Sequence, residues 1–245
     1  MTTRIRLVVP CYNEGQRLRP DAFLQLLASR PDVSILFVDD GSRDATPSIL
    51  AGIAAQCGGR AEVLALDANQ GKARAVRQGV LAALASGAEL VGYWDADLST
   101  PLDAVASFVE TLDARPDVDL VMGARVKLLG RDIERLAVRH YAGRIFATAA
   151  SIVLGLGVYD TQCGAKLFRA GSPIADAFRE PFRSRWIFDV EVLERFVRRV
   201  GPAAAAARIY EFPLVRWHHA PGSKLMPRHV LRAAWDLLLI AVTRD

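Results

Sequence analysis

The feature that most constrains the fold is a series of continuously apolar segments that alternate with Ala- and Leu-rich helical patterns. The apolar segments cover residues 4–10, 33–38, 61–66, 89–94 and 118–123, and the helical patterns lie near 20–29, 44–56, 70–86 and 101–113. Strands that are apolar on both faces and are separated by helices are typical of a parallel sheet covered on both sides. The sequence therefore predicts an α/β fold with a mostly parallel central sheet flanked by helices.

The chain has 245 residues, of which 51% are hydrophobic and 24% are charged, so it can form a substantial core and is not expected to be disordered. Neither a repeat nor a linker interrupts it. We expect a single domain over residues 1–225, followed by a C-terminal amphipathic helix over residues 226–245.

Targeting signals and cysteines restrict the cellular location. The N-terminus lacks the residue order of a signal peptide, and the longest nearly uncharged apolar segment, residues 145–158, is shorter than the roughly 20 residues that span a bilayer. Cys11, Cys57 and Cys163 are an odd number without paired metal spacing, which indicates reduced thiols in the cytosol.

Polar residues gather where the predicted strands end, which is where ligands of parallel sheets bind. They are residues 10–14 after the first strand, Asp39 and Asp40 after the second, residues 67–72 after the third and residues 95–97 after the fourth.

Asp95 and Asp97 form a D-A-D motif directly after an apolar strand. Side chains two residues apart in an extended segment point the same way, and two like charges repel unless a cation or a hydrogen-bond donor lies between them. Carboxylate oxygens suit Mg²⁺ or Mn²⁺, which take other ligands from water and substrate phosphates. The motif therefore predicts a site for a metal-bound diphosphate, although an isolated D-x-D is also common in solvated loops.

Several motifs occur together in a fixed order. They are V-V-P-C-Y-N-E, V-D-D-G-S-R-D-A-T, N-Q-G-K-A-R-A-V-R-Q-G and D-A-D-L-S-T-P at consecutive strand ends, then D-T-Q-C-G-A-K-L-F-R, W-I-F-D-V-E and H-H-A-P-G-S-K-L. This combination resembles the family 2 glycosyltransferases of the GT-A fold, whose N-terminal half is nucleotide-binding and Rossmann-like. The last three motifs resemble the branch that makes polyprenyl-phosphate sugars, especially the dolichyl-phosphate glucosyltransferases, with dolichyl-phosphate mannose synthases as close relatives.

The resemblance covers residues 8–225. Eukaryotic members of the glucosyl branch carry an N-terminal membrane helix, whereas this sequence starts directly at its first predicted strand.

The resemblance implies a nucleotide-sugar site and a metal site. The expected nucleotide-sugar-binding residues are Pro10, Tyr12, Glu14, Val38, Asp40, Lys72, Asp95, Ala96, His218 and Lys224. Asp97 is the first expected metal ligand, Asp95 is expected to contact both ribose and metal, and Ser99 is the position from which some relatives supply a third ligand. Asp39 is expected to form only a turn or a helix cap.

Three of these residues carry further interpretations. Lys72 opens a predicted helix, so it either binds an anion there or is a solvated surface lysine. His218 stands where mannosyl relatives often carry an arginine. Lys224 lies in a loop that closes over the donor in the resembled family, where its lysine contacts phosphate.

The acceptor decides whether the reaction needs a general base. A sugar hydroxyl needs a carboxylate to take its proton, whereas a phosphate monoester, with a second pKa of about 6, is largely dianionic at neutral pH. Asp189 lies where hydroxyl-directed relatives keep their base. With a lipid-phosphate acceptor, Asp189 and Glu191 are expected to position basic side chains or Gln162; alternatively, Glu191 faces solvent.

A basic segment precedes a long apolar pattern. Its basic residues are Arg125, Lys127, Arg131, Arg135, Arg139 and Arg144, against Asp132 and Glu134. By resemblance, Arg125 binds phosphate and completes a catalytic set with Asp97 and Asp189. We expect Arg125, Arg131, Arg135 and Arg139 to bind the acceptor phosphate; the plainer interpretation is a solvated helix face.

Two segments are predicted as amphipathic helices. The first covers residues 133–156, with Ile133, Leu136, Ala137, Tyr141, Ile145, Ala149, Ile152 and Val153 on one apolar stripe. The second covers residues 226–242 and contains Trp235, a residue suited to the headgroup level of a membrane. Each is compatible with a packed helix, but the pair, together with the lipid-phosphate acceptor that the resemblance implies, favours docking at a membrane interface.

The expected function is that of an inverting, Mg²⁺- or Mn²⁺-dependent glycosyltransferase, peripheral on the cytosolic face of a membrane. By resemblance it moves glucose from UDP-glucose to polyprenyl or dolichyl phosphate. The spacing does not separate this from a GDP-mannose-dependent polyprenyl-phosphate mannosyltransferase, from transfer to a sugar hydroxyl in polysaccharide assembly, or from a catalytically idle nucleotide-binding module. Nucleic-acid binding fits poorly, because the basic residues accompany an apolar helix rather than stacking aromatics.

Overall fold

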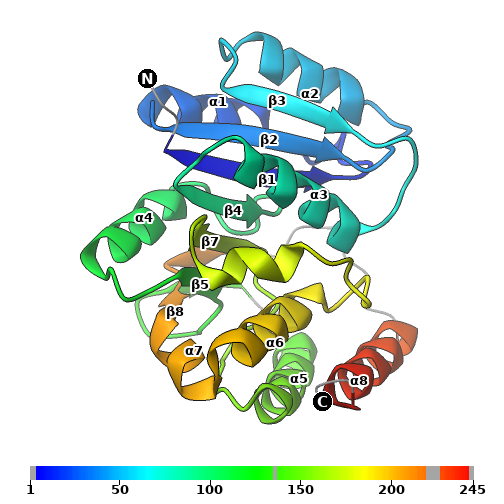
Figure 1. The fold of residues 1–245 in the computed structure, drawn as a ribbon. Helices are drawn as coiled ribbons and strands as arrows, with labels where there is room; N and C mark the ends of the chain where they lie inside the picture. The colour runs from blue at the N-terminus through cyan, green and yellow to red at the C-terminus, as the bar shows by residue number, and fades with distance from the viewer. Residues whose placement is uncertain (1–3, 135–136, 219–226, 243–245) are drawn as a thin grey trace.

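In the computed structural model of this chain, which describes residues 4–134, 137–218 and 227–242, a seven-stranded sheet lies between two layers of helices (Figure 1). Its strands, in spatial order, are β3 (Ala61–Ala65), β2 (Val33–Asp39), β1 (Ile5–Cys11), β4 (Leu90–Trp94), β7 (Ala165–Arg169), β5 (Leu120–Ala124) and β8 (Ile209–Pro213). Strand β7 runs antiparallel to β4 and β5, and the other neighbours are parallel. The five predicted strands are all present, with ends that shift by one or two residues.

Each face of the sheet has its own apolar core, because alternate residues of a strand point to opposite faces. Val8, Val38 and Tyr93 pack on one side, and Phe37 and Trp94 pack on the other. The first side is covered by α3 (Lys72–Ala85), α5 (Ala137–Leu154), the 3₁₀ helix η1 (Pro173–Phe178) and α6 (Phe188–Val200), and the second by α1 (Pro20–Ser29), α2 (Thr46–Ala55) and α4 (Ala104–Ala114).

The C-terminal part completes the first layer. The short helix α7 (Pro202–Arg208) leads into β8, and α8 (Pro227–Val242) packs against α5 and α6. Ala233, Leu237 and Ile240 of α8 are buried in the same core cluster as α3 and α6. In the part of the chain that the structure describes, every helix falls short of the length and hydropathy needed to cross a membrane.

The predicted helix over residues 133–156 is wrong at its N-terminal end. Asp132–Ile133 instead form strand β6, which pairs in parallel with β9 (Arg216–Trp217). The backbone N–H of Asp132 donates to Val215 O at 2.9 Å, so this segment satisfies its hydrogen bonds across the pair rather than within a helix. Ile133 is buried there.

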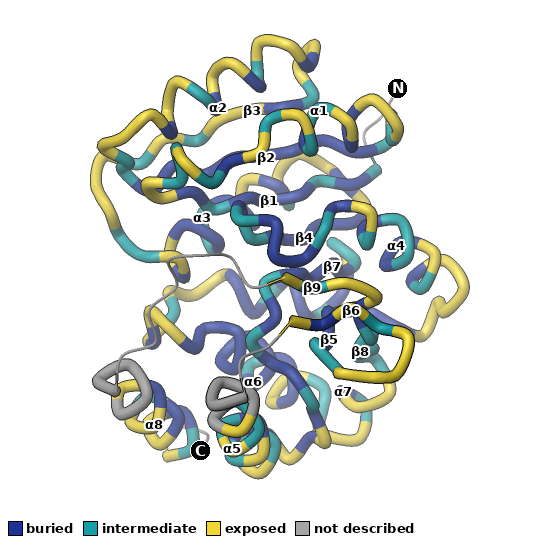
Figure 2. The backbone as a smooth tube through the Cα atoms, turned by 180° about the vertical axis from the view of Figure 1, so that it is seen from behind, coloured by how far each residue is buried: buried dark blue, intermediate teal, exposed yellow. Residues whose placement is uncertain are grey.

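The predicted apolar stripe of α5 is divided between the core and the outside, because Ala149 and Val153 are half-buried against the core. Tyr141, Ile145 and Ile152 are exposed, whereas Ala147 and Leu154 of the same helix are buried. Helix α8 likewise exposes large apolar side chains, which are Trp235, Leu238, Leu239 and Val242. Because the exposed residues recur at helical spacing, each helix presents an apolar face to the outside. Figure 2 shows both helices at one end of the molecule.

Candidate active site

The D-A-D motif follows β4 and is held by backbone contacts on both sides. The N–H of Asp95 donates to Gly164 O at 3.0 Å, and Asp97 Oδ1 accepts from the N–H of Ser99 at 3.0 Å. Leu98 between them adopts the left-handed conformation, with φ 51°. This tight turn leaves both carboxylates half-buried at the end of the strand.

Gly164 lies directly against the carboxylate of Asp95. A Cβ atom at this position would lie 1.9 Å from Asp95 Oδ2, which is far inside van der Waals contact. Gly164 immediately precedes β7, so the antiparallel strand brings the D-T-Q-C-G-A-K-L-F-R motif against the D-A-D motif. Sequence reasoning noted this motif but did not assign the glycine a role.

Lys72 begins α3 and points at the D-A-D motif. Its Nζ lies 2.5 Å from Asp95 Oδ1. Burial lowers the pKa of Lys72, but the charges of Asp95 and Asp189 outweigh burial and raise this pKa above its ordinary value. Lys72 is therefore an ion-paired cation beside the D-A-D motif, and its contact with a bound anion stays a prediction.

Glu14 adds a third carboxyl group to this region. Its Oε1 accepts from Arg17 Nη2 at 2.6 Å, whereas its Oε2 is buried and has no hydrogen-bond partner among the described residues. Burial raises the pKa of Glu14, Arg17 opposes that rise, and the negative charges of Asp97 and Asp95 add to it. Glu14 is therefore electrostatically coupled to the D-A-D motif.

The ligand atoms at the end of β4 fit a divalent cation. Asp95 Oδ1 forms an ion pair with Lys72. It has no hydrogen-bond partner among the described residues. Glu14 Oε2 is similarly unsatisfied. Carboxylate oxygens are the ligands that Mg²⁺ and Mn²⁺ prefer, and these two oxygens lack a hydrogen-bond partner among the described residues. Asp95 and Asp97 are the residues that would hold such an ion.

The acidic turn after β2 fixes the loop that precedes Lys72. Asp39 Oδ1 accepts from the N–H of Ser42 at 3.0 Å, which confirms its predicted turn role. Asp40 is buried and accepts from Asn69 Nδ2 at 3.0 Å and from the N–H groups of Gln70 at 2.7 Å and Gly71 at 2.8 Å. Asp40 thus shapes one wall of the site, and its direct contact with a nucleotide stays a prediction.

The other expected nucleotide contacts differ in what their side chains offer. Tyr12 is 43% exposed just beyond β1, so its ring has a face on which a base can pack. The Val38 and Ala96 side chains are buried in the two cores, so any contact from these residues must come from the backbone. Pro10 is half-buried and lies opposite Val38 in the sheet.

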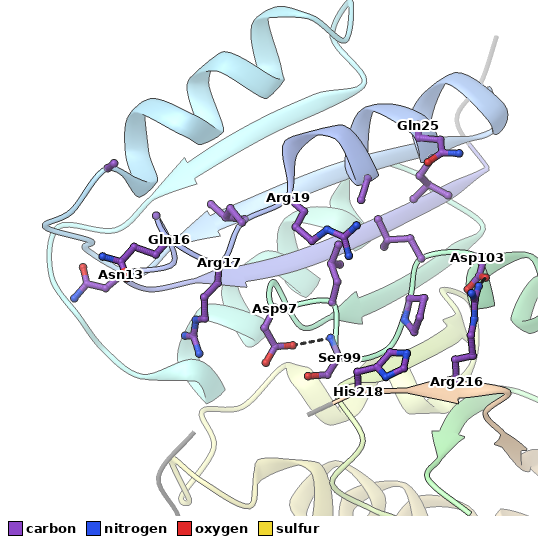
Figure 3. A pocket seen from close by; sticks show the side chains of 18 of the residues that line it. Asn13, Gln16, Arg17, Arg19, Gln25, Asp97, Ser99, Asp103, Arg216 and His218 are labelled. Atoms are coloured by element: carbon purple, nitrogen blue, oxygen red, sulfur yellow. Dashed lines mark hydrogen bonds and ion pairs between the residues drawn. The ribbon is translucent and has the colours of Figure 1, made fainter. Parts of the chain in front are cut away.

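A cavity of about 1600 Å³ opens beside the D-A-D motif, with Asp97, Ser99 and His218 at one end (Figure 3). The N–H of His218 donates to Ser99 O at 3.0 Å, which holds β9 beside this loop. The imidazole lies 3.4 Å from Glu134 and 3.6 Å from Asp132. These three side chains form an exposed cluster that sequence reasoning missed, because it did not foresee the pairing of β6 with β9.

Asp189 is engaged in a buried network. Its Oδ1 accepts from Lys166 Nζ at 2.6 Å and from the Tyr93 hydroxyl at 2.6 Å. Lys166 is 1% exposed and also donates to Thr161 O at 3.1 Å and Cys163 O at 2.7 Å. Asp189 therefore holds a basic side chain, and through it the segment that leads to Gly164. Lys166 is a second residue that the sequence reasoning did not single out.

Glu191 is buried, so the alternative that it faces solvent is wrong. It accepts from the N–H of Arg183 at 2.9 Å and from Arg195 Nη2 at 2.6 Å. These donors lie in the turn before α6 and on α6 itself, so Glu191 stabilises the start of the helix that carries Asp189.

Of the arginines expected to bind the acceptor phosphate, the structure describes the side chains of Arg125 and Arg131. Arg125 donates to Asp160 through Nε at 2.6 Å and Nη2 at 2.8 Å, and it lies over the ring of Trp217. Arg131 is half-buried between β5 and β6. The predictions for Arg135, the Arg139 side chain and Lys224 fall outside the described residues.

Solved structures share this arrangement of strands and helices. The glucosyl-3-phosphoglycerate synthase from Mycobacterium tuberculosis in complex with Mn²⁺ and uridine-diphosphate-glucose superposes with a TM-score of 0.69 at 17% identity, over 98% of this chain and 78% of that chain. The complex of that enzyme with uridine-diphosphate also gives 0.69, at 18% identity, over 98% and 81% of the two chains. The fold is the GT-A fold of glycosyltransferases, as predicted.

Sequence comparison then defines the family. Residues 7–172 match the family model described as Glycosyl transferase family 2, and the chain belongs to this family. Dolichyl-phosphate beta-glucosyltransferases are similar over nearly the whole chain. One from Trichomonas vaginalis is 31% identical over 96% of this chain and 70% of its own length, and the one from Homo sapiens is 30% identical over 98% and 75%. That of Saccharomyces cerevisiae is 30% identical over 96% and 73%.

Proposed function

We propose that this chain is an inverting glucosyltransferase that moves glucose from UDP-glucose to polyprenyl or dolichyl phosphate. The observation that carries the proposal is the pair Asp95 and Asp97 at the end of β4, with Asp95 held against Gly164 and Lys72 and Asp97 held by the N–H of Ser99. The relatives named dolichyl-phosphate beta-glucosyltransferase, each similar over more than 90% of this chain, indicate the donor and the acceptor.

The protein residues bind and orient the two substrates. Tyr12 and Glu14 contact the nucleoside, and Lys72 places a positive charge beside the diphosphate. Asp97 and Asp95 would hold Mg²⁺ or Mn²⁺, which would supply positive charge to neutralise the departing diphosphate. The acceptor phosphate attacks the anomeric carbon from the opposite side, so the configuration at that carbon inverts.

The state of Asp189 supports a phosphate acceptor over a sugar hydroxyl. A general base needs a carboxylate oxygen within reach of the hydroxyl proton. Asp189 is 4% exposed, and its Oδ1 already accepts from Lys166 and Tyr93. A phosphate nucleophile is already ionised at neutral pH and needs no base. Asp189 therefore acts as a positioning residue.

The outward apolar faces of α5 and α8 support a peripheral position on a membrane, and we propose that this is its cytosolic face. Ile145 and Ile152 on α5, and Trp235 and Val242 on α8, are each more than 60% exposed. An apolar helix face with tryptophan suits the boundary between headgroups and acyl chains. A lipid-phosphate acceptor resides in that boundary, so the two helices bring the enzyme to its substrate.

The direct test is a transfer assay with labelled nucleotide sugars. The protein is incubated with UDP-glucose or GDP-mannose, Mn²⁺ and a polyprenyl phosphate, and the lipid product is identified by mass. We expect a glucosylated lipid phosphate with UDP-glucose. Transfer to a simple saccharide, with none to the lipid phosphate, would establish the hydroxyl-acceptor alternative instead.

Chelation is expected to abolish transfer. Removing the metal leaves the carboxylates of Asp95 and Asp97 facing the diphosphate, so both donor binding and departure of the diphosphate weaken. Turnover is measured in excess EDTA and again after Mg²⁺ or Mn²⁺ is restored. Thermal unfolding in EDTA serves as the control for folding. Full turnover in the chelator contradicts the metal assignment.

Gly164→Ala is expected to reduce turnover by about 100-fold, since displacing a reacting group by ~1 Å has an effect of this size. The new Cβ atom would otherwise lie 1.9 Å from Asp95 Oδ2, so the carboxylate must move. Gly171→Ala is the matched control, because a Cβ atom there meets no atom within 4 Å. Equal activities of the two variants would show that Asp95 need not occupy this position.

Asp189→Asn is expected to lower the rate without changing its pH dependence. The rate of transfer to a lipid phosphate should rise as the acceptor becomes dianionic, around pH 6, in both proteins. Rates from pH 5 to 8 under saturating donor measure this limb. Loss of the acidic limb in the variant would identify Asp189 as a general base.

A further inference from the structure

A second, smaller cavity lies outside the proposed catalytic site, between α3 and the loop that precedes α6. Its volume is about 480 Å³. It is lined by Asn69, Gln70, Ala73, Arg74, Arg77, Gln78, Pro181, Phe182, Ser184 and Arg185. The lining thus contains three guanidinium groups and three side-chain amides, and every lining residue is either basic or neutral.

The positive charges of this cavity are not neutralised by carboxylates in the described part of the chain. Arg185 Nη2 donates to Gln70 O at 2.9 Å, and Arg77 donates to Arg179 O, so both engage neutral carbonyls. Arg77 Nε is buried without a hydrogen-bond partner among the described residues. Arg74 is exposed and makes no side-chain hydrogen bond or ion pair with any of them. Three guanidinium groups without a counter-charge form a site for an anion.

The cavity borders the apolar surface of α8. Ser184 in its wall donates through Oγ to Asp236 Oδ2 of α8 at 2.6 Å. The neighbouring Trp186 is 49% exposed, and Trp235 on α8 is 63% exposed. Figure 1 shows the loop before α6 running between α3 and α8. The basic cavity is therefore linked through Ser184 and Asp236 to the helix that exposes Trp235. Basic side chains suit the phosphates of a membrane, and exposed tryptophan suits its interface.

We propose that Arg74, Arg77 and Arg185 form a binding site for the phosphate headgroup of an anionic bilayer phospholipid. This lipid is a docking ligand and not the acceptor, which is expected at Arg125. The inference rests on the proposed function only for the presence of a membrane. Headgroup binding here fixes the rotation of the enzyme about α8, so that the D-A-D edge meets the membrane in one orientation.

Vesicle flotation of the full chain tests the site. Vesicles of pure phosphatidylcholine are compared with vesicles that also contain phosphatidylglycerol, using the wild type, Arg74→Gln and Arg74→Glu. Arg74 is chosen because it is exposed and its side chain is unpaired among the described residues, so its replacement leaves the packing unchanged. Arg198→Glu is the matched control, because Arg198 is also an exposed arginine but lies away from the cavity. It is in the last turn of α6, whereas the cavity lies next to the loop before the first turn.

The wild type is expected to prefer the anionic vesicles, and the preference should fall as salt is raised. Arg74→Gln should lower the partition coefficient about five-fold and Arg74→Glu about twenty-five-fold, since each charge near an anionic surface contributes ~1 kcal/mol. Arg198→Glu should change it less than two-fold. Equal losses in Arg74→Glu and Arg198→Glu would reduce the effect to net charge and overturn the site.

Two further arms separate the possible outcomes. If inorganic phosphate at millimolar concentration releases the protein from anionic vesicles as effectively as soluble phosphatidylglycerol headgroup does, the site binds free phosphate and the lipid assignment is overturned. Glucose transfer to a short polyprenyl phosphate in detergent needs no bilayer. Transfer without any Arg74 effect on flotation contradicts only this inference, whereas an Arg74 effect without transfer contradicts only the proposed function.

Discussion

Asp97→Asn is expected to reduce glucose transfer by at least about 100-fold while the protein stays folded. A charged metal ligand stabilises the departing diphosphate by several kcal/mol, and ~3 kcal/mol corresponds to about 100-fold in rate. The fold should survive because, among the described residues, Asp97 Oδ1 accepts from the N–H of Ser99 alone, and an asparagine oxygen can accept the same bond. Initial rates with UDP-glucose and Mn²⁺ measure the effect.

Asp117→Asn is the matched control for this substitution, because Asp117 is an exposed aspartate that pairs with Arg115 at the surface. It should retain full activity. A rise in the Mn²⁺ concentration needed for half-maximal rate in Asp97→Asn, measured by titration, would identify lost metal affinity as the cause. Undiminished turnover of Asp97→Asn at ordinary Mn²⁺ concentrations would remove Asp97 from the site.

Lys166→Met is expected to lower the free energy of unfolding by ~3–5 kcal/mol, because removing one partner of a buried ion pair leaves the other charge uncompensated. Asp189 would keep only the Tyr93 hydroxyl as a donor to its Oδ1, and the carbonyls of Thr161 and Cys163 would lose theirs. A loss of this size is a large fraction of the stability of an ordinary domain. Urea unfolding followed by circular dichroism measures it.

The double variant Lys166→Met with Asp189→Asn separates the charge effect from packing. Removing both charges should restore part of the stability, because no buried charge remains unpaired. If the loss in free energy of unfolding of the double variant equals the sum of the losses of the two single variants, the attraction between the two charges does not contribute to stability. A single-variant loss below ~1 kcal/mol would show that Lys166 is not a structural link.

Local sequence signals were sufficient for the nucleotide-side half of the molecule. Each of β1 to β4 is an apolar run followed by polar residues, and parallel strands bring those ends to one edge without further information. The D-A-D motif, Lys72 and the turn role of Asp39 were predicted in this way. Conversely, the sequence did not reveal that Asp40 is committed to the 69–71 loop, because such a bond depends on the path of a neighbouring loop.

The remaining features depend on pairings between distant segments. Strand β7 is a five-residue segment that runs antiparallel to β4 and β5, and it was not among the predicted strands, so the roles of Gly164 and Lys166 were not visible. The same reason applies to β6 and β9, which place His218 beside Asp132 and Glu134. Short segments without periodicity carry too little local signal, and their partners are chosen by the packing of the whole chain.

The position of β7 also determines when, during its synthesis, the protein becomes able to work. Strands β1 to β5 emerge in order from the ribosome. Among β1 to β4, the pairs β1–β2 and β2–β3 join strands that are consecutive in the sequence, and the pair β1–β4 joins strands that are not. Contacts between distant segments form late, because their loops are costly to close. Asp95 donates its N–H to Gly164 O only after β7 has paired with β4. We therefore expect a nascent chain to form its nucleotide-side sheet before Asp95 reaches its final position, so that incomplete chains lack activity.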